Sequence, residues 1–380
     1  MKIEQLIYTE KEKWQSVEVQ EDCADAGLVL LFGSGELLKL KENIEYIRKK
    51  YPRAEVIGAS TAGEICGNEV HDATIVSTAI LFETTKIKVV EESILQVEDS
   101  FNTGLVLAGK LDHHGLVHVF VLSEGLNING SELTKGLNEG FGNLIPVTGG
   151  LAGDKADFNE TILVHNQPGL KNLVLAVGFY GGQVKIGYGS KGGWDSFGVD
   201  RLVTKSKANI LYELDGQPAL ELYKKYLGDH ASTLPASALL FPLNLRFRNS
   251  ETNLVRTVLS VNEHDGSMVF AGDIPEGEYV RLMKVSFDKL VDGAHGAAEM
   301  TRVKTGGPNP GLAILISCVG RKLVLKQRVD EEVEAVRDAL GPETIITGFY
   351  SYGEIAPAGV IEQKCELHNQ TMTVTVIREV

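Results

Sequence analysis

The sequence predicts an α/β (mixed α+β) fold of two domains, in which mixed β-sheets are flanked by helices. Three observations support this prediction. Three segments, residues 27–82, 115–180 and 310–380, repeat the same order of features. Each segment opens with a short apolar run and continues into apolar residues at helical spacing. Each then passes through a glycine-rich turn into an alternating strand, so the chain contains three diverged strand-helix-strand-turn-strand units.

The first element of each copy is an apolar run bounded by small residues, which is typical of a strand buried on both faces. These runs are residues 28–32, 117–122 and 312–317. A loop of small residues follows each run, with the sequences GSGE, SEGLNING and SCVGRK. Loops at the carboxyl ends of strands in an α/β sheet are where ligands usually bind, so we expect these loops near a ligand.

The second element of each copy is a helix, predicted from apolar residues at helical spacing. The apolar positions are Ile44 and Ile47 in the first copy, Leu133 and Leu137 in the second, and Val333, Val336 and Leu340 in the third. We expect Ser131 to cap the N-terminus of the second-copy helix. Each helix is expected to end at a glycine or proline, namely Pro52, Gly142 and Gly341.

The second strand of each copy leads into a glycine-rich turn that ends in Gly followed by an acid, here called the Gly-acid turn. The three turns are residues 58–64, 148–154 and 348–354, with the sequences GASTAGE, TGGLAGD and GFYSYGE. After a variable excursion each copy has a His followed by Asp or Asn, at His71, His165 and His368. An alternating strand then closes each unit. Three matching features in one order indicate an internal repeat.

The chain between the second and third copies has a different pattern. Residues 183–214 alternate and predict hairpin strands, and residues 218–227 predict a helix with Pro218 in its first turn. Residues 239–290 again predict strands separated by turns. We therefore expect an N-terminal extension over residues 1–26, a domain with two copies over 27–214, and a domain with the third copy over 215–380.

Composition restricts the partners of the protein. The 380 residues are 43% hydrophobic, enough for large cores, and carry a net charge of −14, which disfavours nucleic acid and anionic membranes. No apolar run is long enough to span a membrane, and the N-terminus lacks a signal-peptide core. The four cysteines form no CxxC pair, which excludes common zinc motifs and favours reduced thiols in a cytoplasmic protein.

The motifs, taken in order along the chain, resemble the FIST proteins. LHNQTM (367–372), GFYSYGEIAP (348–357) and SCVGRK (317–322) resemble the C-terminal domain of that family. The segments that resemble its N-terminal domain and the junction are GASTAGEI (58–65), TGGLAGD (148–154), residues 203–228 and residues 234–243. The resemblance covers nearly the whole chain after about residue 25.

The resemblance implies an intracellular sensory module that binds a small ligand such as an amino acid. A related branch of the family is similar but binds haem and reports nitric oxide to a histidine kinase or a cyclic-di-GMP enzyme. No kinase, cyclase or DNA-binding segment is recognisable in this sequence. We therefore expect a separate output protein as partner, with a histidine kinase or a cyclic-di-GMP enzyme as the candidate.

We expect the ligand to contact polar residues of the Gly-acid turns and of the loops after the first strands. Carboxylates beside hydroxyls suit a ligand ammonium group, and turn amides or Arg321 suit its carboxylate. The candidate ligand-binding residues are Ser60, Thr61, Glu64, Ser123, Glu124, Asn127, Asp154, Cys318, Arg321, Tyr350, Tyr352 and Glu354. The alternative is that each acid accepts hydrogen bonds from nearby backbone and that the turns are structural.

Haem binding is the alternative function and requires an axial ligand such as His, Cys, Met or Tyr. The main candidates are His165 and Tyr188, with His113, His114 and Cys318 also considered. Residues 186–198 look like a Gly-Trp loop of the family, in which a His is common at the position of Tyr188. This departure weakens the haem hypothesis or replaces the ligand by phenolate. The threefold repetition of the His-Asp/Asn positions favours a structural role for those histidines.

An enzyme is the remaining alternative. The sequence has no HExxH, GxSxG, Walker A or GxGxxG motif in a suitable context. Cys318 precedes Gly320 and Arg321, so a thiolate assisted by positive charge, with His368 as base, is the version of catalysis to consider. It would be an acyl transfer or hydrolysis. With no further support for it, the sequence predicts a binding protein and no enzymatic activity.

Overall fold

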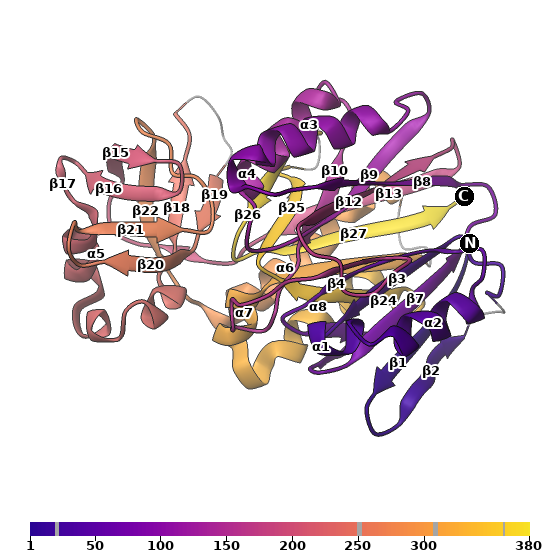
Figure 1. The fold of residues 1–380 in the computed structure, drawn as a ribbon. Helices are drawn as coiled ribbons and strands as arrows, with labels where there is room; N and C mark the ends of the chain where they lie inside the picture. The colour runs from indigo at the N-terminus through magenta and orange to yellow at the C-terminus, as the bar shows by residue number, and fades with distance from the viewer. Residues whose placement is uncertain (20–22, 249–252, 307–310, 360–361) are drawn as a thin grey trace.

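The computed structural model describes residues 1–19, 23–248, 253–306, 311–359 and 362–380. It consists of a body, built from the three repeat copies and the segments next to them, and a lobe, built from residues 195–284 between the second and third copies (Figure 1). The mixed α/β architecture predicted from the sequence is confirmed. No helix among the described residues is long and apolar enough to cross a membrane.

Each copy forms the predicted unit, in which two parallel strands joined by a helix pair with a third, antiparallel strand. The first copy consists of β3 (Leu28–Gly33), α2 (Lys41–Lys50), β4 (Glu55–Ser60) and β7 (Ile75–Leu81). The second consists of β9 (Leu116–Ser123), α4 (Gly130–Gly140), β10 (Val147–Leu151) and β12 (Leu173–Tyr180). The third consists of β23 (Leu312–Cys318), α8 (Val329–Leu340), β24 (Ile345–Ser351) and β27 (Met372–Glu379).

The copies are interlocked, because the strands after each Gly-acid turn join the sheet of another copy. In the first copy, β5 (Glu64–Cys66) pairs with β24 of the third copy and with β6 (Glu69–His71). In the second, β11 (Leu163–His165) pairs with β4 of the first copy. In the third, β25 (Gly353–Pro357) pairs with β10 of the second copy and with β26 (Cys365–His368). The exchange is cyclic and closes the three sheets into one ring.

The opposite edge of each sheet is completed by strands that precede the copies or follow them. β1 (Lys2–Thr9) pairs with β7 and with β2 (Lys13–Val19), so residues expected to form an N-terminal extension lie in the first sheet. β8 (Lys86–Ser93) pairs with β12, and β13 (Val184–Lys191) pairs with β27. The body therefore depends on both ends of the chain.

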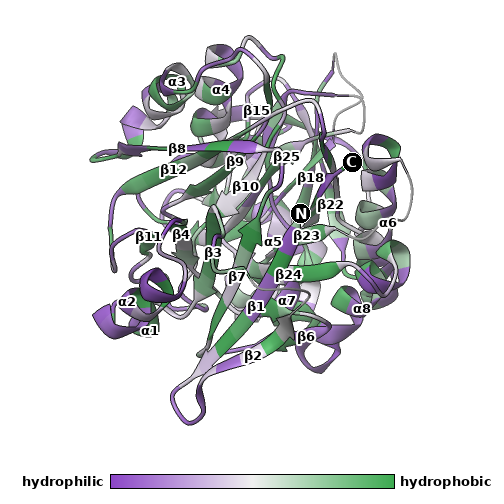
Figure 2. Ribbon diagram, turned by 90° about the vertical axis from the view of Figure 1, so that its right-hand side faces the viewer, coloured by the Kyte–Doolittle hydropathy of each residue, from purple (hydrophilic) through white to green (hydrophobic). Residues whose placement is uncertain are grey.

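The three sheets surround a central apolar core, in which Phe32, Phe120 and Phe349 come from the three different copies. The outer faces of the sheets are covered by helices, which Figure 2 shows at three corners of the body. The helices not yet named are α1 (Gly35–Leu38), α3 (Ser100–Lys110), α6 (Phe287–Thr305) and α7 (Val319–Leu325), with 3-10 turns η1 (Val97–Asp99) and η4 (Lys326–Arg328). Apolar side chains pack the helices against the sheets, for example Ile44 of α2 and Leu137 of α4.

The lobe has its own core around a further sheet and lies at the left of Figure 1. The sheet order among the described residues is β19-β18-β22-β15-β16-β21-β20, with β14 on β22 and β17 on β16. These strands are β14 (Asp195–Ser196), β15 (Arg201–Lys207), β16 (Ile210–Leu214), β17 (Gln217–Pro218), β18 (Leu243–Arg246), β19 (Asn253–Arg256), β20 (Val258–Asn262), β21 (Ser267–Phe270) and β22 (Tyr279–Lys284). The helical segments are α5 (Ala219–Leu227), η2 (Gly228–Thr233) and η3 (Ala236–Leu240). The boundary expected between residues 214 and 215 falls inside this sheet.

Two local expectations about helix starts need correction. Asn129, and not Ser131, caps α4, because the Asn129 side chain accepts hydrogen bonds from the backbone N–H groups of Ser131 and Glu132. Pro218 precedes the first turn of α5 as its N-cap residue and also pairs with β16. In both cases the helix begins one or two residues away from the position that the sequence pattern indicated.

The Gly-acid turns contain one glycine whose role is the same in all three copies. At Gly58, Gly149 and Gly348 an added Cβ would lie only 2.3, 1.9 and 1.9 Å from a carbonyl oxygen of the neighbouring parallel strand. Such contacts are far shorter than van der Waals separation, so no side chain fits without moving the strands apart. The repeated glycine is therefore required by close packing of two backbones.

Replacing Gly348 by alanine is expected to lower the free energy of unfolding by about 3 kcal/mol, because the methyl group must displace the Leu315 carbonyl. The matched control is Gly109→Ala in α3, where an added methyl meets nothing within 4 Å. That control should stabilise the protein by about 0.5–1 kcal/mol. Urea unfolding of both variants measures the difference, and equal stabilities would contradict this account of the turn.

Candidate functional site

A cleft lies between the lobe and the body and consists of two adjoining cavities of about 330 and 300 Å³. Both cavities are lined by Phe158 and Tyr352 from the body and by Leu259 and Ala271 from the lobe. The larger cavity also borders Cys318 at the start of α7. Its volume is in the range of small-molecule sites. The cleft therefore lies where the Gly-acid turns of the second and third copies meet the lobe.

The body wall of the cleft is held by Tyr352 and Asp154, which come from two different Gly-acid turns. The Tyr352 hydroxyl donates to the Asp154 carboxylate, and its ring stacks on Phe158 with centroids 4.5 Å apart and planes at 17°. The carboxylate also accepts from the backbone N–H groups of Asn159 and Glu160, both at 2.7 Å. Burial raises the pKa of Tyr352, so its hydroxyl stays a donor at neutral pH.

The walls of the larger cavity contain buried polar atoms without partners. Asn369 Oδ1, on the body side, and Thr257 Oγ1, on the lobe side, accept or donate no hydrogen bond within the described part of the chain. The next residue, Gln370, has a buried carboxamide that is unpaired at both ends within the same residues. Unpaired buried polar atoms cost free energy and are uncommon, and they mark places where a ligand or water completes the hydrogen bonding.

Glu64 and Glu354, the acids of the first and third Gly-acid turns, do not line the cleft and are buried in equivalent hydrogen-bond networks. Each carboxylate accepts from a hydroxyl of its own turn and from the hydroxyl and amide of a threonine further on: Thr61 and Thr74 for Glu64, Ser351 and Thr371 for Glu354. Burial raises the pKa of Glu64 to about 7 and that of Glu354 to about 8. Both glutamates therefore fit the alternative stated above, in which the acid of the turn accepts hydrogen bonds from nearby groups and has a structural role.

Arg321 and Tyr350 were expected at the ligand, and the structure places them elsewhere. Arg321 is 0% exposed and forms a buried ion pair with Glu332, at 2.9 Å from Nε and 2.7 Å from Nη2. Its remaining hydrogen bonds go to the carbonyls of Gly192 and Leu290. The Tyr350 hydroxyl donates to the same Glu332 carboxylate at 2.6 Å. Arg321 and Tyr350 therefore both bind Glu332, and neither side chain lines the two cavities of the cleft.

Cys318 lines the larger cavity, but its surroundings oppose a thiolate. Burial raises the pKa of the Cys318 thiol, and the guanidinium of Arg321 is already paired with Glu332. The base considered from the sequence, His368, hydrogen-bonds the Ala356 carbonyl through Nε2 at 3.0 Å. Burial lowers the pKa of His368 to about 4. In this geometry the Cys318 thiol is therefore not activated as a nucleophile.

The other candidate residues are distributed around the turns. Ser60 Oγ accepts from the Ile162 backbone N–H at 3.0 Å, Ser123 donates to a backbone carbonyl, and Asn127 is exposed. Glu124 is buried beside the smaller cavity, which its neighbour Gly125 lines, and burial raises the pKa of Glu124. Thr61 borders a separate polar cavity together with Asp154. The structure thus brings Tyr352 and Cys318 to the cleft, places Asp154 behind Tyr352 as its hydrogen-bond acceptor, and leaves the rest of the set outside.

His165 and Tyr188, the main candidates for a haem ligand, do not fit that group. Both ring nitrogens of His165 face carboxylates, Nδ1 that of Glu91 and Nε2 that of Glu55. Tyr188 is 1% exposed, and its hydroxyl donates to the Glu362 carbonyl and contacts Lys304. None of these side chains presents a free ligand atom to the cleft, and a protonated Cys318 thiol is a poor ligand for iron.

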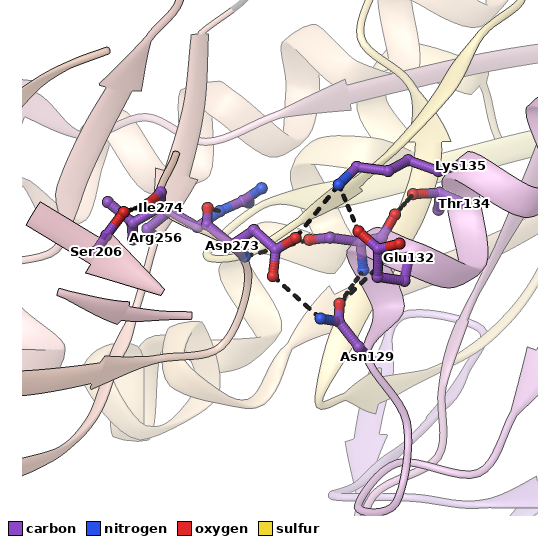
Figure 3. Close-up of polar contacts among 9 residues, drawn as sticks. Asn129, Glu132, Thr134, Lys135, Ser206, Arg256, Asp273 and Ile274 are labelled. Atoms are coloured by element: carbon purple, nitrogen blue, oxygen red, sulfur yellow. Dashed lines mark hydrogen bonds and ion pairs between the residues drawn. The ribbon is translucent and has the colours of Figure 1, made fainter. Parts of the chain in front are cut away.

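A polar seam beside the smaller cavity connects the lobe to the body. Figure 3 shows Asp273 of the lobe pointing toward Asn129 and Lys135 on α4. Asn129 Nδ2 donates to Asp273 at 3.0 Å, and Lys135 Nζ lies 3.4 Å from the same carboxylate. Arg256 of the lobe donates to the Leu367 carbonyl of the body at 2.9 Å. Asn129 also lines the smaller cavity. The contacts that hold the lobe against the body therefore lie directly beside the cleft.

Sequence reasoning missed four residues of the cleft, namely the apolar Phe158, Leu259 and Ala271 and the polar Thr257. Three of them belong to the lobe, where no repeat pattern pointed to a site. Phe158 lies in the variable excursion after the second Gly-acid turn and is 50% exposed. A large aromatic residue in an otherwise polar excursion, DKADFNET, was the available signal.

Comparisons with known proteins agree with the motif order. Residues 27–217 match the model of the FIST N domain, and residues 219–357 match that of the FIST C domain. The uncharacterized protein MJ1623 of Methanocaldococcus jannaschii is 26% identical over 381 residues, covering 92% of this chain and 70% of that protein. Among solved structures, cyanuric acid hydrolase from A. caulinodans is similar over 94% of this chain and 91% of that one. With 8% identity and a TM-score of 0.36, it contributes nothing to the assignment.

Proposed function

Because the chain belongs to the FIST family and carries its N domain followed by its C domain, we propose that it is a cytoplasmic sensory protein. It binds a small, amino-acid-like ligand in the cleft between lobe and body and signals to a separate output protein. A histidine kinase or a cyclic-di-GMP enzyme is the candidate partner. The protein acts by binding, without catalysing a reaction on its ligand.

The observation that supports this proposal is the composition of the cleft walls. Leu259 and Ala271 of the lobe and Phe158 and Tyr352 of the body line both cavities. A ligand there touches both parts, so its affinity depends on how the lobe is placed. A ligand shifts a conformational equilibrium only through such a difference in affinity.

The seam offers a route from the cleft to the surface. Asp273 follows Ala271 and Gly272, which line the smaller cavity, and its carboxylate contacts Asn129 and Lys135 on α4. Displacement of the 271–273 segment by ligand alters these contacts directly. Because Lys135 is half exposed, the seam is open to an output protein.

Ala271→Trp is expected to abolish ligand binding, because the indole ring fills space in both cavities. The measurement is a thermal-shift screen of amino acids and related metabolites. At a ligand concentration of about 100 Kd the wild type gains roughly 2.7 kcal/mol of stability. Hydrogen exchange of residues 271–274 should slow in the same samples.

The matched control is Val303→Trp, which adds the same ring to an exposed position on α6. That variant should keep the full ligand response. A ligand that stabilises the Ala271→Trp protein as much as the wild type binds outside the cleft, which would refute the proposed site.

A further inference from the structure

The chemistry of the larger cavity revises the class of ligand; the inference rests on the proposed function for the cleft as the binding site and replaces the amino-acid-like ligand by an uncharged one. Among the described residues that line this cavity there is no Asp, Glu, Lys or Arg. A charged group moved from water into such a site loses its hydration and gains no opposite charge. A free amino acid brings an ammonium and a carboxylate, so the cavity disfavours it.

Three charged side chains near the cavity form their ion pairs or hydrogen bonds with other parts of the protein. Arg321 is paired with Glu332, and Asp154 accepts from Tyr352 and from backbone amides. Arg256 lies beside the smaller cavity, behind Gly272, and donates to carbonyl groups. None of these groups is available to neutralise a zwitterion in the larger cavity.

The uncharged polar atoms in the cavity walls indicate which hydrogen-bonding group the ligand carries. Asn369 Oδ1 and Thr257 Oγ1 lie in the body wall and the lobe wall and are buried without a partner among the described residues. The amide oxygen of Asn369 is an acceptor only, because its amide nitrogen already donates to the His368 carbonyl. A ligand N–H or O–H group would complete its hydrogen bonding.

The remaining wall favours a flat ring. Phe158 and Tyr352 stack with planes at 17°, and Phe158 is half exposed toward the cleft. Leu259 and Leu323 add apolar surface at the rim. Aromatic rings pack against such walls in stacked or edge-on arrangements. We propose that the larger cavity binds an uncharged aromatic compound that carries one hydrogen-bond donor, for which indole is the simplest probe.

The test is a calorimetric or NMR titration of the full chain with indole and three matched probes. Benzothiophene keeps the ring shape but has sulfur in place of the N–H group, 1-methylindole blocks the N–H group, and tryptophan adds the zwitterion. Indole should bind saturably, and each of the other probes should bind roughly tenfold more weakly. Ala271→Trp should remove the binding of indole.

The hydrogen bond is tested by Asn369→Leu and, as a gentler change, by Thr257→Val. At least one of the two should abolish the preference for indole over benzothiophene while binding of the ring persists. A preference that survives both changes overturns the assignment of the donor. Absence of saturable indole binding, or tryptophan binding as tight as indole, overturns the inference of an uncharged ligand. In that case the cleft still stands as the sensor site if Ala271→Trp blocks the charged ligand that the metabolite screen identifies.

Discussion

Replacing Arg321 by alanine is expected to lower the free energy of unfolding by about 3–5 kcal/mol. The substitution removes the guanidinium that pairs with Glu332 at 2.7 Å, where both side chains are 0% exposed. The Glu332 carboxylate then keeps only hydroxyl donors, from Tyr350 and Ser317, and stays buried without a counter-charge. Chemical denaturation monitored by circular dichroism measures the loss.

Two comparisons separate this effect from the simple loss of an ion pair. Arg328→Ala removes a pair with Glu331 at the surface, where both side chains are about 40% exposed, and should cost far less stability because solvent screens the charges. The double change Arg321→Met with Glu332→Leu removes both buried charges and should recover most of the stability. A loss of only about 1 kcal/mol for Arg321→Ala would contradict the burial described here.

Raising the pH from 6.5 to 9 is expected to destabilise the protein through Glu64 and Glu354. The folded pKa values of these groups are raised to about 7 and about 8, against 4.5 for an ordinary glutamate. Folding thus favours their protonated forms, so this contribution is fully present below pH 4.5 and is lost as the pH rises through 7 and 8. Between pH 4.5 and its folded pKa, each glutamate is ionised in the unfolded state only, so it lowers the free energy of unfolding by about 1.4 kcal/mol per pH unit.

The buried histidines act in a different pH range and do not obscure this effect. Burial lowers the pKa of His118 to about 3 and that of His368 to about 4. Their contribution is therefore present above pH 6.5 and is lost as the pH falls below it. Between pH 6.5 and 9 the two histidines therefore add no pH dependence of their own.

The control for the pH dependence is the double variant Glu64→Gln, Glu354→Gln, which has no carboxyl group to ionise at either position. Because both glutamates of the unfolded wild type are already ionised at pH 6.5, the variant should be more stable than the wild type there, and its stability should change much less up to pH 9. Urea unfolding at each pH gives the comparison. A wild-type profile that is flat over this range, or a variant profile equally steep, would contradict the raised pKa values.

The repeat was predictable from the sequence because its signals are local. Alternating or continuous apolar runs, helical spacing and turn glycines depend on neighbouring residues, so the three units and their elements could be predicted. Gly149 illustrates the limit of that prediction. The pattern marked it as a turn residue, whereas the structure shows that it lets two parallel strands approach closely.

The candidate site was only partly predictable, because similar sequence positions meet different environments. Glu64, Asp154 and Glu354 are equivalent in the repeat. Two of them are buried in hydroxyl networks, while Asp154 holds Tyr352 at the cleft. The repeat pattern could not show this difference, because it depends on which surfaces the lobe covers.

The sequence by itself determined the three units, the family and the Gly-acid turns, because each follows from residues close together in the chain. Only the tertiary structure decided how the strands after the turns are exchanged between copies and where the lobe meets the body. Those contacts join residues such as Tyr352 and Asp154, which are 198 positions apart. The tertiary structure also shows that Arg321 forms a buried ion pair with Glu332. The residue type alone could not predict this, because packing determines which groups surround a buried charge.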